Sequence, residues 1–232
     1  MPLRNTPNLC PPDIPPAFRA NSEGVPCYHH SPLHALLHGF NLRPDSNETV
    51  NLVPQHPNWI PLLTTHITTD KDEAAACTRT QMDKVQVFCN SSGLKGGIGA
   101  AAVVMTPPEG PHLQYLLGKD MVHTVFKSEL VGILLALQLL CRYPSARTAL
   151  IAQDNQAAIV ALTNRPSQPR QYIVNTIHNQ LCVLRCSQPC MRVHVKWTLG
   201  HTKVHGNKRA DTLTRATAEG ARSLLNDLPW IL

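Results

Sequence analysis

The stretch KVQVFCNSSGLKGGIGAAAVVM, residues 84–105, determines the fold that we expect for this chain. Apolar residues recur at every second position of residues 85–89, which is the pattern of a strand. Glycines and serines at residues 91–97 predict a turn, and the small and β-branched residues 98–105 predict a second strand. With a third strand at residues 112–118, this region predicts an antiparallel meander.

Alternating helices and strands are expected after the meander. Apolar residues recur with the 3.6-residue period of a helix at residues 124–143, and Pro144 ends that helix. Further elements are predicted in this order: a strand at 148–152, helices at 154–162 and 168–186, a strand at 191–197 and a helix at 207–221. This order predicts a mixed α/β (α+β) fold, with a five-stranded sheet of three antiparallel strands and two crossover strands, and helices on both faces.

Charge and proline divide the 232 residues into parts of different character. Residues 1–83 hold five basic and eight acidic residues and most of the prolines, which predicts a largely extended connector with short helices at 34–40 and 70–77. Residues 84–220 hold 15 basic and six acidic residues and are expected to form one compact domain, followed by a tail at 221–232. The basic domain favours a polyanionic partner such as nucleic acid, although a solvated basic face would give the same composition.

The sequence argues against several classes of protein, including membrane-spanning and secreted proteins. No apolar run approaches the roughly 18–20 residues of a membrane span, and the proline-rich residues 1–16 lack the apolar core of a signal peptide. The eight scattered cysteines, without a secretory signal, predict reduced thiols in an intracellular protein, in the nucleus or the cytoplasm. Only 5% of the residues are aromatic, which disfavours a stacking platform for single strands.

One cysteine spacing admits a metal site as an alternative. Two histidines and three cysteines fall at intervals of four residues: His178, Cys182, Cys186, Cys190 and His194. The first three would share one face of a helix and could offer zinc ligands. Because Pro189 should end that helix, we expect these thiols to pack as small apolar groups instead.

Three carboxylates stand out because the domain has few acids. Glu129 lies in the first turns of the long helix, Asp154 follows the fourth strand, and Asp211 lies early in the last helix. Strand ends and helix starts converge at one edge of such a sheet. The three oxygen ligands would suit Mg²⁺ there, although each acid taken alone is more typical of a helix cap or a surface charge.

Four segments resemble type 1 ribonuclease H domains in order and spacing. They are VFCNSSG (87–93), KSELVGILLAL (127–137), IAQDNQAA (151–158), and HVKW followed by GHTKVHGNKRAD (194–211). The amino-acid sequence of these segments is similar to that of ribonuclease H domains at the C-terminal end of fungal non-LTR retrotransposon polyproteins. There, a connector that resembles residues 1–80 joins a reverse transcriptase to the ribonuclease H domain.

The resemblance implies an endonuclease that cleaves the RNA strand of an RNA–DNA hybrid at a site for two Mg²⁺ or Mn²⁺ ions. Glu129, Asp154 and Asp211 would be metal ligands, and His201 would assist proton transfer or product departure. Asn90 stands where the family has its first catalytic aspartate, so it would be a fourth, neutral metal ligand. We therefore expect impaired cleavage or none.

Substrate contacts are also implied by the resemblance and by the charge. The candidates for binding nucleic acid are Ser92, Gly93, Asn155, Lys196, Lys203 and Lys208. Three interpretations stay open: an active hybrid ribonuclease, a non-catalytic module that binds hybrids or duplexes, and an inert retrotransposon remnant.

Overall fold

The computed structural model describes residues 18–20, 26–28, 40, 62–68, 85–105, 110–163, 171–198 and 204–232. The chain divides into two compact units, Met1–Thr49 and Val50–Leu232. In the first unit, strands β1 (Phe18–Ala20) and β2 (Pro26–Tyr28) pair antiparallel. Of the short helices predicted at residues 34–40 and 70–77, all but residue 40 lie outside the described residues.

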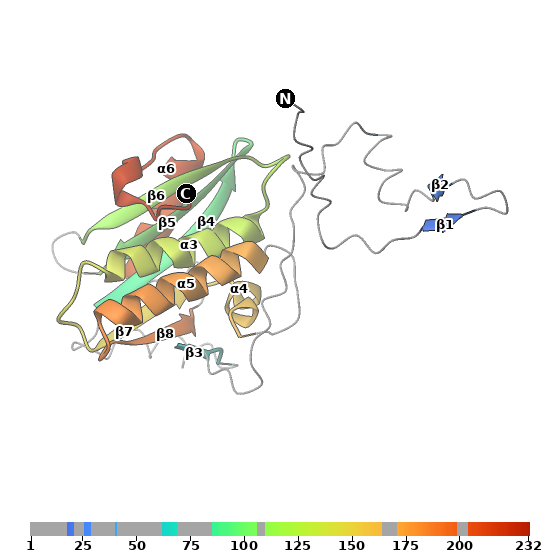
Figure 1. Cartoon of the computed structure of the whole chain (residues 1–232). Coiled ribbons are helices and arrows are strands. Elements are labelled where there is room, and N and C mark those ends of the chain that lie inside the picture. The colour runs from blue at the N-terminus through green and yellow to red at the C-terminus, as the bar shows by residue number, and fades with distance from the viewer. Residues whose placement is uncertain are drawn as a thin grey trace, which may run out of the picture. The chain divides into compact units, whose positions relative to one another are not determined.

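The second unit is built on a mixed six-stranded sheet in the order β3-β8-β7-β4-β5-β6 (Figure 1). Its strands are β3 (Leu63–His66), β4 (Val85–Leu94), β5 (Gly97–Val104), β6 (His112–Lys119), β7 (Thr148–Gln153) and β8 (Arg192–Trp197). Strands β4, β5 and β6 form the expected antiparallel meander, and β7, β8 and β3 extend the sheet with parallel pairs. The predicted mixed sheet, with an antiparallel meander followed by parallel crossover strands, is therefore confirmed.

The expected count of five strands is corrected to six by β3, which comes from the predicted connector. β3 pairs with β8 in parallel from Leu63, opposite Val193, to His66, opposite Lys196. Leu63 is only 4% exposed, and the Thr64 hydroxyl hydrogen-bonds His194 Nδ1. A four-residue strand that pairs across such a sequence distance gives little local signal, because its stability comes from the sheet it joins.

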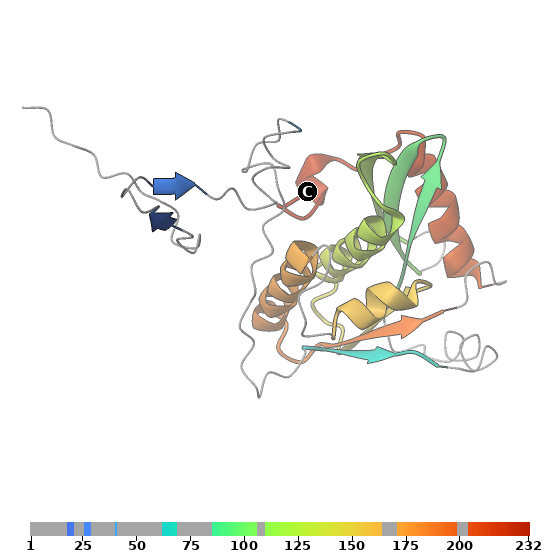
Figure 2. The same cartoon turned by 90° about the vertical axis from the view of Figure 1, so that its right-hand side faces the viewer.

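Helices cover both faces of the sheet, as predicted (Figures 1 and 2). They are α3 (Val125–Leu140), α4 (Gln156–Ala161), α5 (Gln171–Ser187) and α6 (His205–Ala218). Helix α3 contacts β4, β5 and β6 on one face and α5 on its other side, whereas α6 contacts the same three strands from the opposite face. The two faces have separate apolar clusters, the larger around α3 and the smaller around Phe88 and Leu213.

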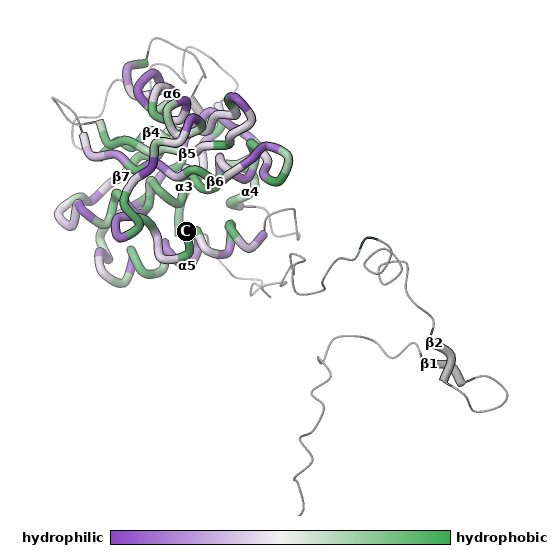
Figure 3. The backbone as a smooth tube through the Cα atoms, turned by 90° about the horizontal axis from the view of Figure 1, so that it is seen from above, coloured by the Kyte–Doolittle hydropathy of each residue, from purple (hydrophilic) through white to green (hydrophobic). Residues whose placement is uncertain are grey.

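Helix α3 is the central element of the core. Thr124 caps it by accepting a hydrogen bond from the Lys127 amide at 3.2 Å. Residues Ser128–Leu137 are all buried, because the helix is enclosed between the sheet and α5. In Figure 3, where the tube is coloured by the hydropathy of each residue, green hydrophobic segments occur at α3 and at the strands beside it. This burial includes Glu129, so the fold places a carboxylate inside the apolar layer.

The turn between β4 and β5 is shorter than the sequence predicts. Only Lys95 and Gly96 form it, with φ angles of 51° and 79°, as in the two-residue turns that suit a twisted hairpin. Residues 91–94, expected in the turn, continue β4 and pair with β5 from Ser91, opposite Ala100, onward. The polar residues that follow Asn90 therefore lie on a strand whose backbone is paired with β5 and do not lie in a loop.

Helix α6 lies very close to the sheet at its first turn. A Cβ atom on Gly206 would be 2.2 Å from Cδ2 of Phe88, so only glycine fits there. At the other end of the helix, a Cβ on Gly99 would be 2.7 Å from the Ala218 amide nitrogen. These two glycines set the height of α6 above the sheet and therefore the position of Asp211.

The C-terminal residues, expected to be a tail, pack onto the domain. Ser223 and Gln114 of β6 exchange two hydrogen bonds of 3.0 and 2.9 Å. Leu228 is buried in the core of α3, and Asp227 pairs with Arg142 at 2.9 Å. In the parts of the chain that the structure describes, no helix is long and apolar enough to cross a membrane.

Candidate active-site cleft

One open cleft of about 460 Å³ brings together most of the predicted site residues. The end of β4, the start of α3, the residue after β7 and the second turn of α6 all contribute to its walls. They supply Asn90, Ser91, Ser92, Gly93, Leu94, Val125, Glu129, Asp154, Asp211 and Arg215. The convergence of three carboxylates at this edge, expected from the sequence, is therefore observed.

Glu129 is the most buried acid of the cleft, with 5% of its surface exposed. The Gln153 side-chain amide donates a hydrogen bond of 2.7 Å to Glu129 Oε2. Burial, and secondarily the charge of Asp154, raise the pKa of Glu129 to about 7, although hydrogen bonds from neighbours that include Gln153 act in the opposite direction. Glu129 and Asp154 thus repel each other across a short distance.

Asp154 and Asp211 have different surroundings. The backbone carbonyl of Asp154 accepts a 2.9 Å hydrogen bond from Trp197 Nε1, which ties the end of β7 to β8. The helix expected from residue 154 begins at Gln156, and Asn155 caps it by accepting from the Ala158 amide at 3.1 Å. Asp211 is only 26% exposed and pairs with Arg215, one turn later, at 3.0 Å.

Asn90 is neutral and its oxygen is partly engaged. Its Oδ1 accepts a hydrogen bond of 2.7 Å from the Ser91 amide. The neighbouring Ser91 side chain interacts with Glu129 and contributes to lowering its pKa. The β4 side of the cleft therefore presents a neutral amide whose oxygen is already engaged.

The donor set of this cleft suits a hard divalent cation, because it consists of oxygens. Among the described residues, however, no three His, Cys, Asp or Glu side chains lie close enough to hold a metal ion together. Mg²⁺ is commonly bound by one or two carboxylates, with waters and substrate phosphates completing its shell. Glu129 and Asp154, which repel each other without a cation, fit one such ion. A second ion would need Asn90 and Asp211, and Asp211 is engaged with Arg215.

The predicted nucleic-acid contacts lie partly in the cleft. Ser92 and Gly93 line it, Asn155 is close enough to lower the pKa of Glu129, and Lys208 is exposed on the first turn of α6. Lys196 lies on β8 and is half-buried. His201 and Lys203 lie outside the described residues, so their predicted roles stay predictions.

Gln153 is the site residue that the sequence reasoning missed. Its side chain is fully buried at the end of β7 and contacts Glu129. The one available signal is a polar residue at the end of the apolar strand TALIAQ, immediately before Asp154. That signal is ambiguous because a strand end is also a common place for an exposed polar residue.

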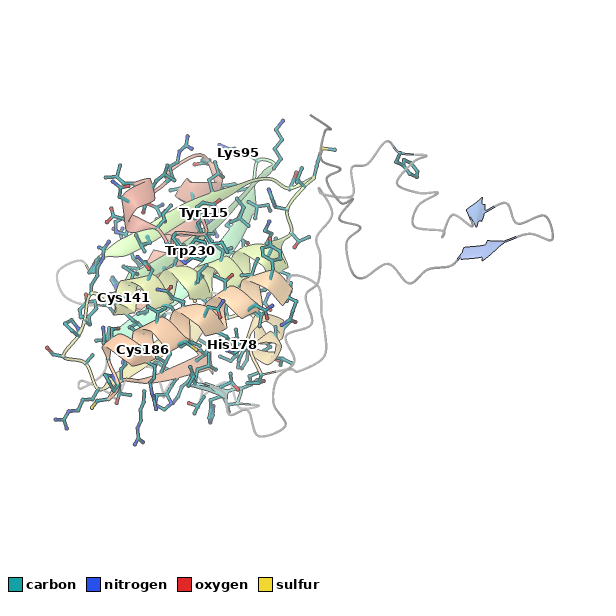
Figure 4. The ribbon with its side chains drawn as sticks, in the orientation of Figure 1. Lys95, Tyr115, Cys141, His178, Cys186 and Trp230 are labelled. Carbon is teal, nitrogen blue, oxygen red and sulfur yellow. The ribbon has the colours of Figure 1, made fainter. Side chains whose placement is uncertain are left out.

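The cysteine alternative is resolved in part. Cys182, Cys186 and Cys190 are exposed free thiols, so the expectation that they pack as apolar groups is wrong for these three. His178 and Cys186 are separated along α5 (Figure 4), and no metal-binding group forms from the described histidines and cysteines. Of the five free cysteines in the part of the chain that the structure describes, only Cys89 is buried, and burial raises the pKa of its thiol well above the usual range.

No protein-family model and no curated protein sequence matches the chain. The structure is similar to that of RNase H1 from the halophilic archaeon Halobacterium salinarum NRC-1, with 13% identity, a TM-score of 0.44, and coverage of 60% of this chain and 99% of that one. It is also similar to the N-terminal RNase H domain of rv2228c from Mycobacterium tuberculosis, with 18% identity, a TM-score of 0.42, and coverage of 58% and 98%. At this low similarity, what the cleft does must be inferred from its own residues.

Proposed function

We propose that the domain binds RNA–DNA hybrids in the manner of a type 1 ribonuclease H and cleaves the RNA strand weakly or not at all. The observation that carries this proposal is the convergence of Glu129, Asp154 and Asp211 with Asn90 in one cleft. The retrotransposon origin and an earlier fusion to a reverse transcriptase stay predictions from the sequence resemblance.

The side chains of the cleft have distinct roles in this proposal. Glu129 and Asp154 would hold one Mg²⁺ or Mn²⁺ ion, which would supply charge stabilisation and water activation in phosphodiester hydrolysis. Asn90 leaves the opposite side without the charge that a second ion requires. Arg215 lines the cleft and Lys208 is exposed on the first turn of the same helix α6, so both charges would be available to phosphates of the substrate backbone.

A non-catalytic hybrid-binding module is the second candidate function. The hydrogen bond between Asn90 Oδ1 and the Ser91 amide favours it, because that oxygen is less available to a metal. The Asp211–Arg215 pair favours it as well, since the guanidinium already compensates the carboxylate. Both candidates share the binding surface and differ only in turnover.

Fluorescence anisotropy with a labelled RNA–DNA hybrid tests the binding. We expect tighter binding of the hybrid than of single-stranded RNA or duplex DNA of the same sequence, and a steep loss of affinity between about 50 and 200 mM salt. Lys208→Gln should reduce the salt slope by about 1. Arg192→Gln, at the far end of β8 from Trp197, is the matched control and should leave the slope unchanged.

Cleavage of the same hybrid in Mn²⁺ distinguishes the two candidates. Slow turnover that Glu129→Gln abolishes supports the impaired enzyme, and binding without turnover supports the module. Equal, salt-insensitive affinity for all three nucleic acids would overturn the proposed function.

A further inference from the structure

A buried chain of polar groups runs beneath the cleft and joins three elements of the fold. It consists of Cys89 on β4, Gln153 on β7 and Glu129 on α3, which are 2%, 0% and 5% exposed. Cys89 precedes Asn90 and Gln153 precedes Asp154 in the sequence. Two members of this polar chain are therefore the immediate sequence neighbours of the site residues Asn90 and Asp154.

Gln153 uses both ends of its side-chain amide in this chain. Its Nε2 donates to Glu129 Oε2 at 2.7 Å and makes a longer contact of 3.5 Å with the Glu129 backbone oxygen. Its Oε1 accepts from the Cys89 thiol at 3.2 Å, and that thiol also lies 3.6 Å from the Ala152 carbonyl. Reversing the amide would point Oε1 at two oxygens of Glu129, so the chain determines its orientation.

Gln153 fixes one oxygen of the Glu129 carboxylate. Oε2 accepts from Gln153 below the cleft that Glu129 lines, and side-chain hydrogen bonds from Ser91 and Asn155 act on the same carboxylate. A buried glutamate without such a partner could rotate its carboxylate and would lose the compensation for its desolvation. Hydrogen bonds from outer residues are a known means of orienting a metal ligand.

We propose that Gln153 is a positioning residue that orients the Glu129 carboxylate for the divalent ion, with Cys89 fixing the orientation of the Gln153 amide. This inference rests on the proposed function, because it takes Glu129 and Asp154 as the ligands of that ion. It adds a supporting residue that lies outside the cleft and that the ribonuclease H resemblance did not identify.

Mn²⁺ binding to the full chain tests the proposal without requiring turnover. Gln153→Met keeps the length of the side chain and removes its hydrogen bonds, so we expect Mn²⁺ affinity to fall about 10- to 100-fold in a calorimetric or EPR titration. Gln114→Met is the matched control, because Gln114 is also buried and donates to Leu213 O and Thr217 Oγ1 away from the cleft. Thermal unfolding of both variants measures the loss of stability that they share.

The outcomes separate this inference from the proposed function. Saturable Mn²⁺ binding that Gln153→Met weakens and Gln114→Met leaves within about twofold supports the positioning role. Equal affinity in the wild type and Gln153→Met overturns the positioning role and leaves the proposed metal site intact. A wild-type chain without saturable Mn²⁺ binding overturns both.

Changes at Cys89 decide the question if Gln153→Met does not fold. Cys89→Ala removes the donor to Gln153 Oε1 and should weaken Mn²⁺ binding several-fold, whereas Cys89→Ser replaces the donor and should restore the affinity. Equal Mn²⁺ affinities of the alanine and serine variants would overturn the proposal.

Discussion

The inner and outer halves of the cleft differ in how far the charges of their carboxylates are neutralised by neighbouring side chains. The inner half consists of Glu129, Gln153 and Asp154, and the outer half of Asn90, Asp211 and Arg215. In the inner half, burial and secondarily the charge of Asp154 raise the pKa of Glu129, and neutral hydrogen bonds from Gln153, Ser91 and Asn155 compensate this only in part. In the outer half, one position is neutral and the remaining acid pairs with an arginine. The inner half is thus suited to a cation, and the outer half has no excess negative charge.

Asn90→Asp should give the largest effect, because it supplies the outer half with the missing charge. We expect hybrid cleavage in Mn²⁺ to rise on the order of 10³-fold or more. Single-turnover cleavage of a labelled hybrid measures it. Asn175→Asp makes the same change on α5, outside the cleft, and should not alter the rate. Equal rates for the wild type and Asn90→Asp would show that the neutral outer half is not what limits cleavage.

Glu129→Gln should reveal how much the inner half costs the folded state without a metal. The folded pKa of Glu129, about 7, lies above its ordinary value of 4.5. The unfolded chain therefore ionises first as pH rises, and the stability present below about pH 4.5 is lost progressively up to about pH 7. Urea unfolding without divalent ions should show similar stability for both proteins near pH 4.5. At pH 8 the variant should be more stable by up to about 3 kcal/mol.

The matched control for this pH dependence is Glu219→Gln. Glu219 pairs with Lys95 on the surface, where both side chains are well exposed. Its change should alter stability by less than about 0.5 kcal/mol at either pH. If the Glu129→Gln variant is no more stable than the wild type at pH 8, ionised Glu129 does not destabilise the folded protein, and the prediction is wrong.

Gly206→Ala should disturb the outer half selectively, because it changes the seat of α6. The added Cβ would overlap the Phe88 ring, which we expect to cost about 1–3 kcal/mol in urea unfolding and to weaken hybrid binding through displaced Asp211 and Arg215. Gly132→Ala on α3 is the control, since its Cβ would meet Cys89 at an ordinary 3.4 Å. It should be neutral or stabilising by up to about 1 kcal/mol. Similar losses in both variants would mean that Gly206 has no special role in seating α6.

The sequence predicted the fold where the signal was local. Period-two alternation in β4 and the apolar period of α3 were confirmed. Glu129, Asp154 and Asp211 all line one cleft, but no three acids of the described residues lie close enough to hold a metal ion together. β3 was missed because its four residues are stabilised by pairing with a strand far along the chain.

The side-chain partners in the cleft were beyond the sequence for a related reason. Gln153 was missed because its role depends on reaching Glu129 across two elements. The sequence showed that Asn90 is neutral, but not that its oxygen accepts from the Ser91 amide. Residue type and order locate the cleft, whereas hydrogen bonds between distant residues determine what each side chain can do there.

Arg215→Gln should have the smallest effect on stability and still separate the two halves. Arg215 is well exposed and pairs with Asp211 one turn away, so its loss should change the free energy of unfolding by less than about 0.5 kcal/mol. Removing the guanidinium leaves Asp211 free to attract a cation and removes one phosphate contact. Mn²⁺ affinity should therefore rise while hybrid affinity falls. If both affinities fall together, Arg215 supports the shape of the cleft and does not compete with a metal for Asp211.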